Sequence, residues 1–420
     1  MQDPDINVYK IKVSLNYLKE VIIFFNRIIV IILDGAGTGS LPDAYKFGDE
    51  GSDTLGHVAL STKLNIPALL ALGLGKIVNN LCPSTGGENT QGAAGKMAQQ
   101  SAGKDTITGH WELAGLILKT PFPVFHKGFP PGVINFFEQL IGRKTLGNIP
   151  ASGTEIIQRL GEEHLKTGYP IVYTSADSVF QVAAHEDIIP RDLLYEWCLL
   201  AREDVLTGNN AVARVIARPF KGEPGNFWRT EGRRDFSLPP PEKTLLDLAE
   251  NAGYEVNVIG KVLDIFAGRG ITQHLPAYNN HSCLEKVSFK LRESFAGILW
   301  TTLTDFDMLY GHRNDVKGFA SELEIFDQYL SKNILPLLNK TDCLIITADH
   351  GCDPTFNGTD HTREYVPLLI YTPGIVPTYL GTRNSFADLG RTITDFLCCE
   401  PTIYGESFAK EIIKRRDPQK

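Results

Sequence analysis

The stretch IIVIILDGAG, residues 28–37, has the form of a buried parallel strand that ends in a carboxylate. Its first six residues are a continuous apolar run rich in β-branched side chains, which is typical of a strand covered on both faces. Helical patterns such as KTLLDLAENAG (243–253) and residues 318–340 alternate with further runs of this kind. The alternation predicts an α/β fold with a layered sheet, and we expect all the runs to be parallel strands. The further runs are YEVNVIG (254–260), GILWTTLTD (297–305), CLIITAD (343–349) and VPLLIYTP (366–373).

Aspartate and histidine residues gather just after three of these strands. Ligands of α/β sheets bind outside the carboxyl ends of the strands, so we expect these side chains to meet at one edge. Three Asp and three His can hold two divalent cations, and a two-metal site clamps the attacking and leaving oxygens of a phosphoryl transfer. The sequence therefore predicts a phosphoryl-transfer enzyme, with Asp305, Asp353 and Asp360 nearby but not bound to metal. The candidate ligands are Asp34, Asp307, His312, Asp349, His350 and His361.

Such an enzyme needs a nucleophile, and the segment GKDTITGHWELAG (103–115) offers Thr106 and Thr108. A threonine hydroxyl ionises far above neutral pH, but coordination by two dications would lower its pKa enough for attack on phosphorus. On this segment alone, an ordinary helix N-cap is the favoured interpretation of either threonine.

Length, charge and cysteine content argue against several classes of protein. A chain of 420 residues is expected to form two domains. The net charge of −8 and the lack of an uninterrupted basic run argue against a nucleic-acid partner. Seven scattered cysteines without a CxxC pair argue against a disulfide framework or a zinc ribbon, and favour the reducing cytoplasm.

The apolar segment VIIFFNRIIVIIL (21–33) raises the question of a membrane anchor. It has 13 residues, interrupted by Asn26 and Arg27, and is too short to span about 30 Å of hydrocarbon. Cleavage after it, as at a signal peptide, would remove or isolate Asp34. We therefore expect residues 1–26 to be an N-terminal extension and expect no membrane partner.

The amino-acid composition changes between residues 119 and 240, where Pro and Gly are frequent. Ser152 and Glu155 form a capping-box pattern ahead of a predicted helix, and strands are expected at 171–177 and 211–220. We predict an inserted, smaller α+β cap domain at 119–240, within a discontinuous core domain formed by 27–118 and 241–420.

Long, ordered strings connect the chain to a known family. From Arg27 to about Lys410 it resembles the phosphopentomutases of the alkaline phosphatase superfamily. The resemblance implies an alkaline-phosphatase-like layered α/β core with a mainly parallel sheet. The matching strings are LPDAYKFGDEGSDTLGH, GKDTITGHWELAG, PASGTEI, YTSADSVFQVAAHE, RVIARPFKGEPGNFWRT, TDFDMLYGHR and TADHGCDPTFNGTDHTREYVPLL.

The resemblance also implies roles for individual residues. Two Mn²⁺ ions would be held, one by Asp34, Asp349 and His350, the other by Asp307, His312 and His361. Thr106 would be the phosphorylated nucleophile. Sugar hydroxyls would meet Ser175 and Asp177, and the phosphate remote from the metals would meet four cations. These cations are Arg214, Arg218, Arg229 and Lys261.

The activity implied is the interconversion of ribose or deoxyribose 1-phosphate with the 5-phosphate, in nucleoside salvage. It would pass through phosphothreonine and a pentose 1,5-bisphosphate, with glucose 1,6-bisphosphate or a similar bisphosphate as activator. Alternatives on the same core are a metal-dependent phosphatase and a cofactor-independent phosphoglycerate mutase. A catalytically dead scaffold is a third, but it would be expected to have lost ligands.

Two positions depart from the pattern we expect of this family. Gly35 stands where serine is usual, and Cys352 stands where asparagine is usual. A thiol so close to a metal could bind a soft metal or make activity sensitive to oxidation. Neither change touches a predicted ligand, so we expect activity to survive.

Overall fold

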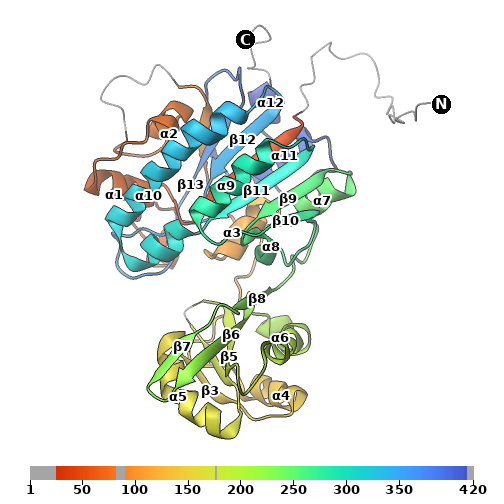
Figure 1. Cartoon of the computed structure of the whole chain (residues 1–420). Coiled ribbons are helices and arrows are strands. Elements are labelled where there is room, and N and C mark those ends of the chain that lie inside the picture. Colours follow the sequence, from red (N-terminus) through yellow and green to blue (C-terminus); the bar gives the residue numbers. More distant parts are fainter. Residues whose placement is uncertain (1–24, 82–89, 176, 414–420) are drawn as a thin grey trace, which may run out of the picture.

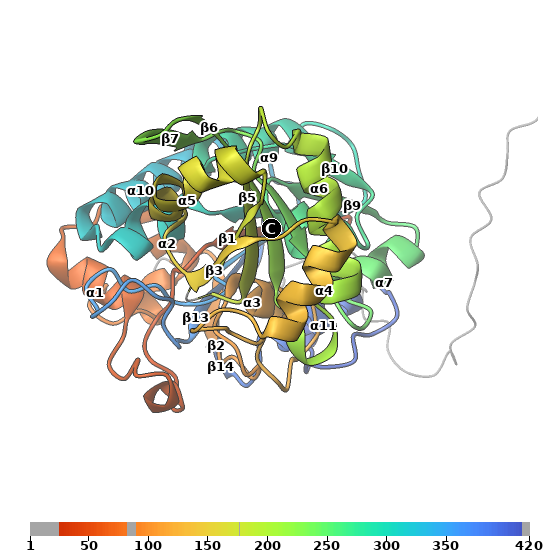
Figure 2. The same ribbon diagram turned by 90° about the horizontal axis from the view of Figure 1, so that it is seen from below.

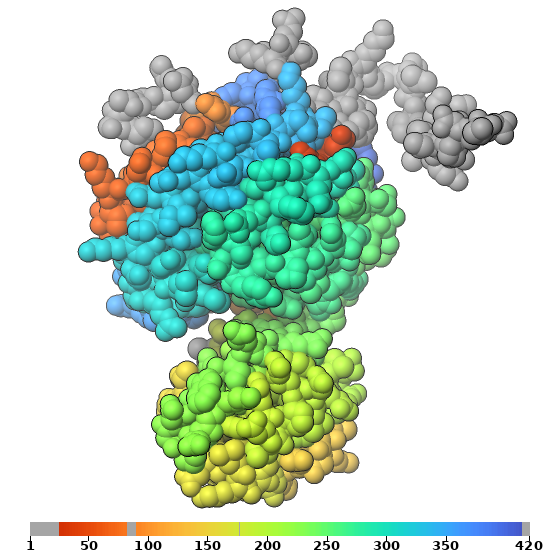
Figure 3. Space-filling view, in the orientation of Figure 1, coloured from red at the N-terminus to blue at the C-terminus, as the bar shows by residue number. Residues whose placement is uncertain are grey.

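The computed structural model describes residues 25–81, 90–175 and 177–413, so nearly all of the predicted extension 1–26 lies outside the described residues. Two bodies are visible, a larger core and a smaller cap below it, joined through a narrow neck (Figures 1 and 3). Within the described part of the chain, no helix is both long enough and apolar enough to cross a membrane.

The core is built on an eight-stranded sheet that is mainly parallel. Its three central strands, β11, β1 and β12, are buried along their whole length, as their unbroken apolar runs predict. In order across the sheet the strands are β10 (Gln273–Leu275), β9 (Glu255–Ile259), β11 (Gly297–Leu303), β1 (Arg27–Leu33), β12 (Asp342–Thr347), β13 (Val366–Tyr371), β2 (Ala93–Met97) and β14 (Thr378–Arg383).

One expectation about this sheet is wrong. The run at 366–373 forms β13, which is antiparallel to both of its neighbours, β12 and β2. A parallel return would need a crossover to the opposite end of the sheet, usually through a helix. Residues 348–365 contain no helix, so the chain turns back at the edge where β12 ended.

Helices cover both faces of the core sheet. Those on one face include α9 and α10, and those on the other include α3 and α11 (Figures 1 and 2). The predicted helix at 318–340 begins as α10 and continues through π- and 3₁₀-helical turns to Leu337. The core helices are α1 (Thr54–Ser61), α2 (Pro67–Leu72), α3 (Thr106–Leu113), α7 (Leu245–Asn251), α8 (Val262–Ile265), α9 (Asn280–Leu291), α10 (Val316–Tyr329), α11 (Ala387–Phe396) and α12 (Ala409–Ile413).

The cap has its own sheet, in the order β3-β4-β5-β6-β7, with β8 paired to β6. Alternate residues of its strands enter different cores: Val172 joins α4 and α6 on one face, while Ile171 and Tyr173 join α5 on the other. Its elements are α4 (Pro131–Ile141), β3 (Leu146–Pro150), α5 (Gly153–Thr167), β4 (Ile171–Thr174), β5 (Val179–His185), α6 (Arg191–Leu200), β6 (Arg214–Glu223), β7 (Asn226–Arg229) and β8 (Arg234–Ser237).

The capping box predicted at Ser152 and Glu155 does not form. Ser152 is the N-cap of α5, but its side chain makes no capping hydrogen bond and its hydroxyl lies 3.0 Å from that of Thr154. A neighbouring hydroxyl therefore replaces the backbone N–H as its partner. The exact domain limits, 119 and 240, remain predictions.

Candidate active site

The three central strands deliver carboxylates to one edge of the core sheet. Asp34 directly follows β1, Asp349 follows β12, and Asp307 lies in the π-helical turn η5 (Phe306–Tyr310) after β11. The strand ends are in register, with Leu33 opposite Leu303 and with Ile32 opposite Thr347. Because the strands are parallel, side chains more than 300 positions apart meet at the same edge.

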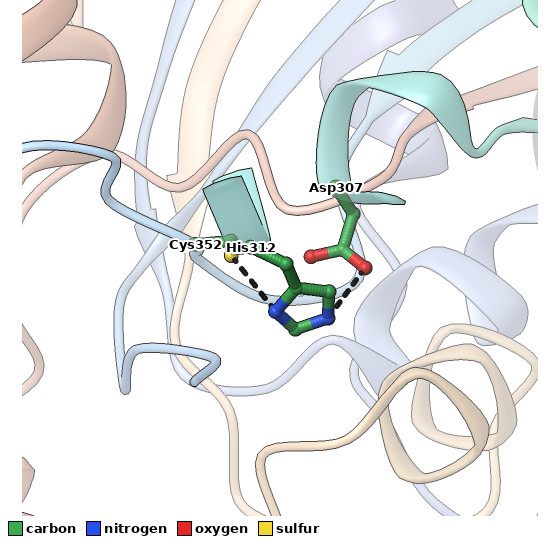
Figure 4. Close-up of side chains that lie close together, drawn as sticks. All are labelled: Asp307, His312 and Cys352. Atoms are coloured by element: carbon green, nitrogen blue, oxygen red, sulfur yellow. Dashed lines mark hydrogen bonds and ion pairs between the residues drawn. The ribbon is translucent and has the colours of Figure 1, made fainter. Parts of the chain in front are cut away.

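Six candidate ligands and one thiol form three overlapping triads at this edge. In each triad the ligand atoms lie within 4.8 Å of one another. The predicted ligands are thus brought together, although Asp307 and His350 each belong to two triads. The triads are Asp34–Asp349–His350, Asp307–His350–His361 and Asp307–His312–Cys352, the last drawn in Figure 4.

Several carboxylate oxygens here lack the partners that burial demands. Both oxygens of Asp34, Oδ1 of Asp307 and Oδ2 of Asp349 are buried and accept no hydrogen bond from the described residues. Imidazole nitrogens lie 3.1–3.6 Å from some of them, without hydrogen-bond alignment. Buried carboxylates are stable when paired or bound to metal, so this arrangement fits cations.

Burial and the negative charges of its neighbours shape the ionisation of the site. Burial raises the pKa of Asp34, and the carboxylates of Asp349 and Asp307 raise it further. Burial alone would lower the pKa of His350, but Asp349 and Asp34 raise it to about 10. The carboxylates therefore favour positive charge at this edge.

The three histidines are oriented by backbone carbonyls. Nδ1 of His312 donates to Thr359 O at 2.6 Å, Nδ1 of His350 to Gly351 O at 3.1 Å and Nδ1 of His361 to Lys104 O at 3.1 Å. Each Nε2 consequently faces a carboxylate: His312 Nε2 lies 3.0 Å from Asp307 Oδ2, and His350 Nε2 lies 3.3 Å from Asp34 Oδ1. Metal-binding histidines are held in this way.

Thr106 and Thr108 lie in different surroundings. Thr106 is the first residue of α3, and its Oγ1 lies 3.2 Å from His350 Nε2. Thr108 is fully buried, and its hydroxyl donates to Asp105, the N-cap residue, at 2.5 Å. The cap role considered for the threonines therefore belongs to Asp105, with Thr108 as its partner.

Helix α3 approaches Asp349 closely, and two residues explain how. A Cβ at Gly109 would lie 2.1 Å from the Asp349 carbonyl oxygen, so this contact requires glycine. His110 is fully buried one turn after Thr106; its Nδ1 donates to Thr106 O at 2.9 Å and lies 3.1 Å from Asp349 Oδ2. Its Nε2 lies 2.7 Å from the Thr302 hydroxyl. Sequence reasoning missed His110, although its spacing of four from Thr106 places both on one helix face.

Two adjoining cavities, of about 230 Å³ and 170 Å³, lie between this cluster and the cap. Thr106 and His361 face both cavities from the core. The predicted substrate residues that line at least one of them are Ser175, Asp177, Arg214, Arg218 and Lys261.

One cation that was not predicted lines a cavity, and one predicted cation lies elsewhere. Arg233 lines the smaller cavity and donates two hydrogen bonds of 2.7 Å to Asp235, and sequence reasoning did not select it. Arg229 lies elsewhere, on β7 beside Tyr173, and lines a groove with Glu186 and Lys221. Burial, together with the charge of Arg233, lowers the pKa of Arg218 to about 10. A cavity lined by such cations favours an anionic ligand.

The nearby carboxylates that we expected to stay off the metals have other partners. Asp305 accepts from the backbone N–H of Asn280 at 2.8 Å, and Asp353 pairs with His57 at 2.6 Å. Asp360 lies 3.3 Å from Lys104 Nζ. None of the three belongs to a triad among the residues that the structure describes.

Comparison with known proteins identifies the family to which the chain belongs. The family description "metalloenzyme superfamily" matches residues 26–401. The phosphopentomutase of Caldanaerobacter subterraneus subsp. tengcongensis is 55% identical over 389 residues, which cover 92% of this chain and 98% of that protein. The phosphopentomutases of Acetivibrio thermocellus and Carboxydothermus hydrogenoformans are 54% and 55% identical, over 92% of this chain and 100% of each. The chain belongs to the phosphopentomutase family, within the metalloenzyme superfamily.

Proposed function

We propose that this chain is a phosphopentomutase, which interconverts the 1-phosphate and 5-phosphate of ribose or deoxyribose. The observation that carries the proposal is the position of Thr106. Its hydroxyl lies beside His350 among the unpartnered carboxylates and faces a cavity lined by cap cations. Relatives more than half identical along nearly their whole length carry this name.

Two divalent cations complete the proposed site, with Mn²⁺ as the expected metal. Asp34, Asp349 and His350 would hold one ion. Asp307, His312 and His361 would hold the other, and the triad that joins Asp307 to His350 and His361 supports two ions close together. When bound, the ions lower the pKa of the nucleophilic hydroxyl and neutralise charge on the transferred phosphoryl group.

Thr106 is proposed to carry the phosphoryl group between the two positions of the sugar. Its Oγ1 gives the group to the free hydroxyl of a pentose monophosphate, and the pentose 1,5-bisphosphate that results returns its other phosphate to Thr106. His110 holds the first turn of α3 through the Thr106 carbonyl, so that the hydroxyl stays at the sheet edge. Glucose 1,6-bisphosphate or a similar bisphosphate would prime the threonine.

The cap is proposed to hold and turn the intermediate. Ser175 and Asp177 are suited to sugar hydroxyls, while Arg214, Arg218 and Lys261, together with Arg233, are suited to the phosphate remote from Thr106. The bisphosphate must reverse its orientation without escaping, so closure of the cap over the core during turnover would retain it and exclude water. We place this activity in the cytoplasm, within nucleoside salvage.

The proposal is tested by turnover of ribose 1-phosphate with Mn²⁺ and a trace of glucose 1,6-bisphosphate. Ribose 5-phosphate and free phosphate are followed together. Ribose 5-phosphate without free phosphate is the expected result, whereas free phosphate as the main product would mean a phosphatase. Thr106→Val should remove both turnover and the phosphothreonine detected by mass spectrometry. Thr108→Val is the matched control, because this buried hydroxyl bonds to Asp105 and should leave phosphorylation in place.

A further inference from the structure

The thiol of Cys352 is part of the same cluster as two of the proposed ligands. Sγ, a carboxylate oxygen of Asp307 and a ring nitrogen of His312 all lie within 4.8 Å of one another (Figure 4). The side chain is 1% exposed. Sγ makes two long hydrogen-bond contacts, each of 3.9 Å, with His312 Nδ1 and with the Asp360 carbonyl. A buried polarisable donor with such weak contacts faces the cluster.

The surrounding chain keeps the thiol in this place. The backbone N–H of Cys352 donates to Gly35 O at 2.8 Å, and it lies 3.1 Å from the hydroxyl of Thr54. Two glycines leave room for the side chain: a Cβ at Gly35 would lie 2.8 Å from Cys352 Cβ, and a Cβ at Gly311 would lie 2.6 Å from Sγ. The two departures from the family pattern, Gly35 and Cys352, are therefore in contact, and serine at 35 would crowd the cysteine.

We propose that Cys352 supplies a sulfur ligand to the metal held by Asp307 and His312, so that this position takes thiophilic divalent ions such as Zn²⁺ or Co²⁺ in preference to Mn²⁺. Together with His361, which the proposed site assigns to the same ion, the set has one sulfur, two nitrogen and one oxygen donor. Such a set is typical of tetrahedral zinc, whereas Mn²⁺ favours sites rich in oxygen. The site proposed above assigns no ligand role to Cys352, so this inference changes the expected ion at this one position only. On metal binding the thiol proton passes to solvent and the sulfur binds as thiolate.

This inference rests on the proposed metal site, so the experiment measures metal binding and sulfur ligation separately. The full chain is freed of metal and titrated with Co²⁺. Bound cobalt is counted by elemental analysis, and thiolate ligation is read from the sulfur-to-cobalt charge-transfer band in the near ultraviolet. Two variants accompany the wild-type chain. Cys352→Ser keeps the size of the side chain but removes the soft donor, and Cys398→Ser removes an exposed cysteine as a control.

The expected result is a charge-transfer band in the wild-type chain and in Cys398→Ser, but not in Cys352→Ser at equal cobalt content. In competition, the ratio of Zn²⁺ to Mn²⁺ affinity should fall by about tenfold or more in Cys352→Ser. Cobalt bound without a band, or a band that persists in Cys352→Ser, would overturn the sulfur ligand and leave the metal site standing. No cobalt bound at all would overturn the metal site itself.

Discussion

Charged side chains are buried at both ends of the central strands, but their hydrogen bonding differs between the two ends. At the amino end, Arg27 Nε and Nη2 donate to Asp342 at 2.8 and 2.6 Å, and Nη1 donates to Leu291 O at 2.8 Å. At the carboxyl end, the oxygens of Asp34 have no hydrogen-bond partner among the described residues. A buried charge is costly unless it is paired. The amino end, where the charges are paired and hydrogen-bonded, therefore stabilises the fold, whereas the carboxyl end, where carboxylate oxygens of the described residues lack hydrogen bonds, is suited to bind a ligand.

The largest effect should come from removing a charge at the carboxyl end. Asp307→Asn should reduce turnover by about a thousandfold or more, equivalent to about 4 kcal/mol of transition-state stabilisation, because a metal would lose its carboxylate. Circular dichroism should show an unchanged fold, since Asp307 supports metal rather than the sheet. The measurement is kcat for pentose phosphate interconversion, and turnover within tenfold of wild type would contradict the two-metal reading.

The same kind of change at the amino end should have the opposite profile. Asp342→Ala leaves the buried Arg27 guanidinium without its carboxylate, and should lower the free energy of unfolding by about 3 kcal/mol or more. Turnover per folded molecule should be nearly unchanged. Urea unfolding measures the loss. The double variant Arg27→Met/Asp342→Leu should recover much of it, because no unpaired charge remains, and failure to recover would mean that the pair holds the sheet in some other way.

Metal binding should stabilise the folded protein only through the residues at the carboxyl ends of the central strands. For the wild-type chain freed of metal, Mn²⁺ at 100 times its dissociation constant should add about 2.7 kcal/mol to the free energy of unfolding for each ion bound. Asp34→Asn should lose the gain from the ion that Asp34 holds, yet should not be less stable than wild type without metal, because it removes one of three crowded carboxylates. Thermal unfolding with and without Mn²⁺ tests both statements. Asp342→Asn is the matched control, since it should keep the gain.

His110 offers a smaller and more specific test. His110→Leu removes the Nδ1–H that holds the Thr106 carbonyl, and should lower kcat by about 10- to 100-fold, the usual effect of a group that orients ligands. His110→Asn places an amide donor near the position of Nδ1 and should recover part of the loss. A merely structural role would instead lower the free energy of unfolding of both variants alike, with kcat per folded molecule unchanged.

How much of this structure the sequence predicts depends on whether a feature is set by neighbouring residues or by residues far apart in the chain. The strands and the strand-end carboxylates could be found because β-branched runs and an Asp after a strand are local patterns. The direction of β13 could not, since it depends on where residues 348–365 take the chain. The choice between Arg229 and Arg233 was equally out of reach. Both lie in one short segment, and the pairing of β7 and β8 with β6 places Arg233 at the cavity and Arg229 at a separate groove.

The last prediction concerns Glu364, a buried carboxylate near the ligand edge that no cation balances among its described hydrogen-bond and ion-pair partners. It accepts from the Thr54 backbone N–H at 2.9 Å and from the Thr54 and Thr362 hydroxyls, and Asp353 is the charged group that faces it. Burial raises its pKa to about 7. The folded state then binds a proton that the unfolded chain releases near pH 4.5, so this group stabilises the fold at low pH and loses that contribution as pH rises towards 7.

Glu364→Gln should remove this part of the pH dependence. Between pH 4.5 and 7 the slope of unfolding free energy against pH should differ between wild type and Glu364→Gln by at most about 1.4 kcal/mol per pH unit. The wild-type chain should show the more negative slope. Asp342→Asn, at the paired end, should not change the slope in this way, because that carboxylate is paired with Arg27. Equal slopes for wild type and Glu364→Gln would mean that Glu364 is ionised throughout. Uncompensated carboxylates at this edge would then be confined to the proposed metal ligands.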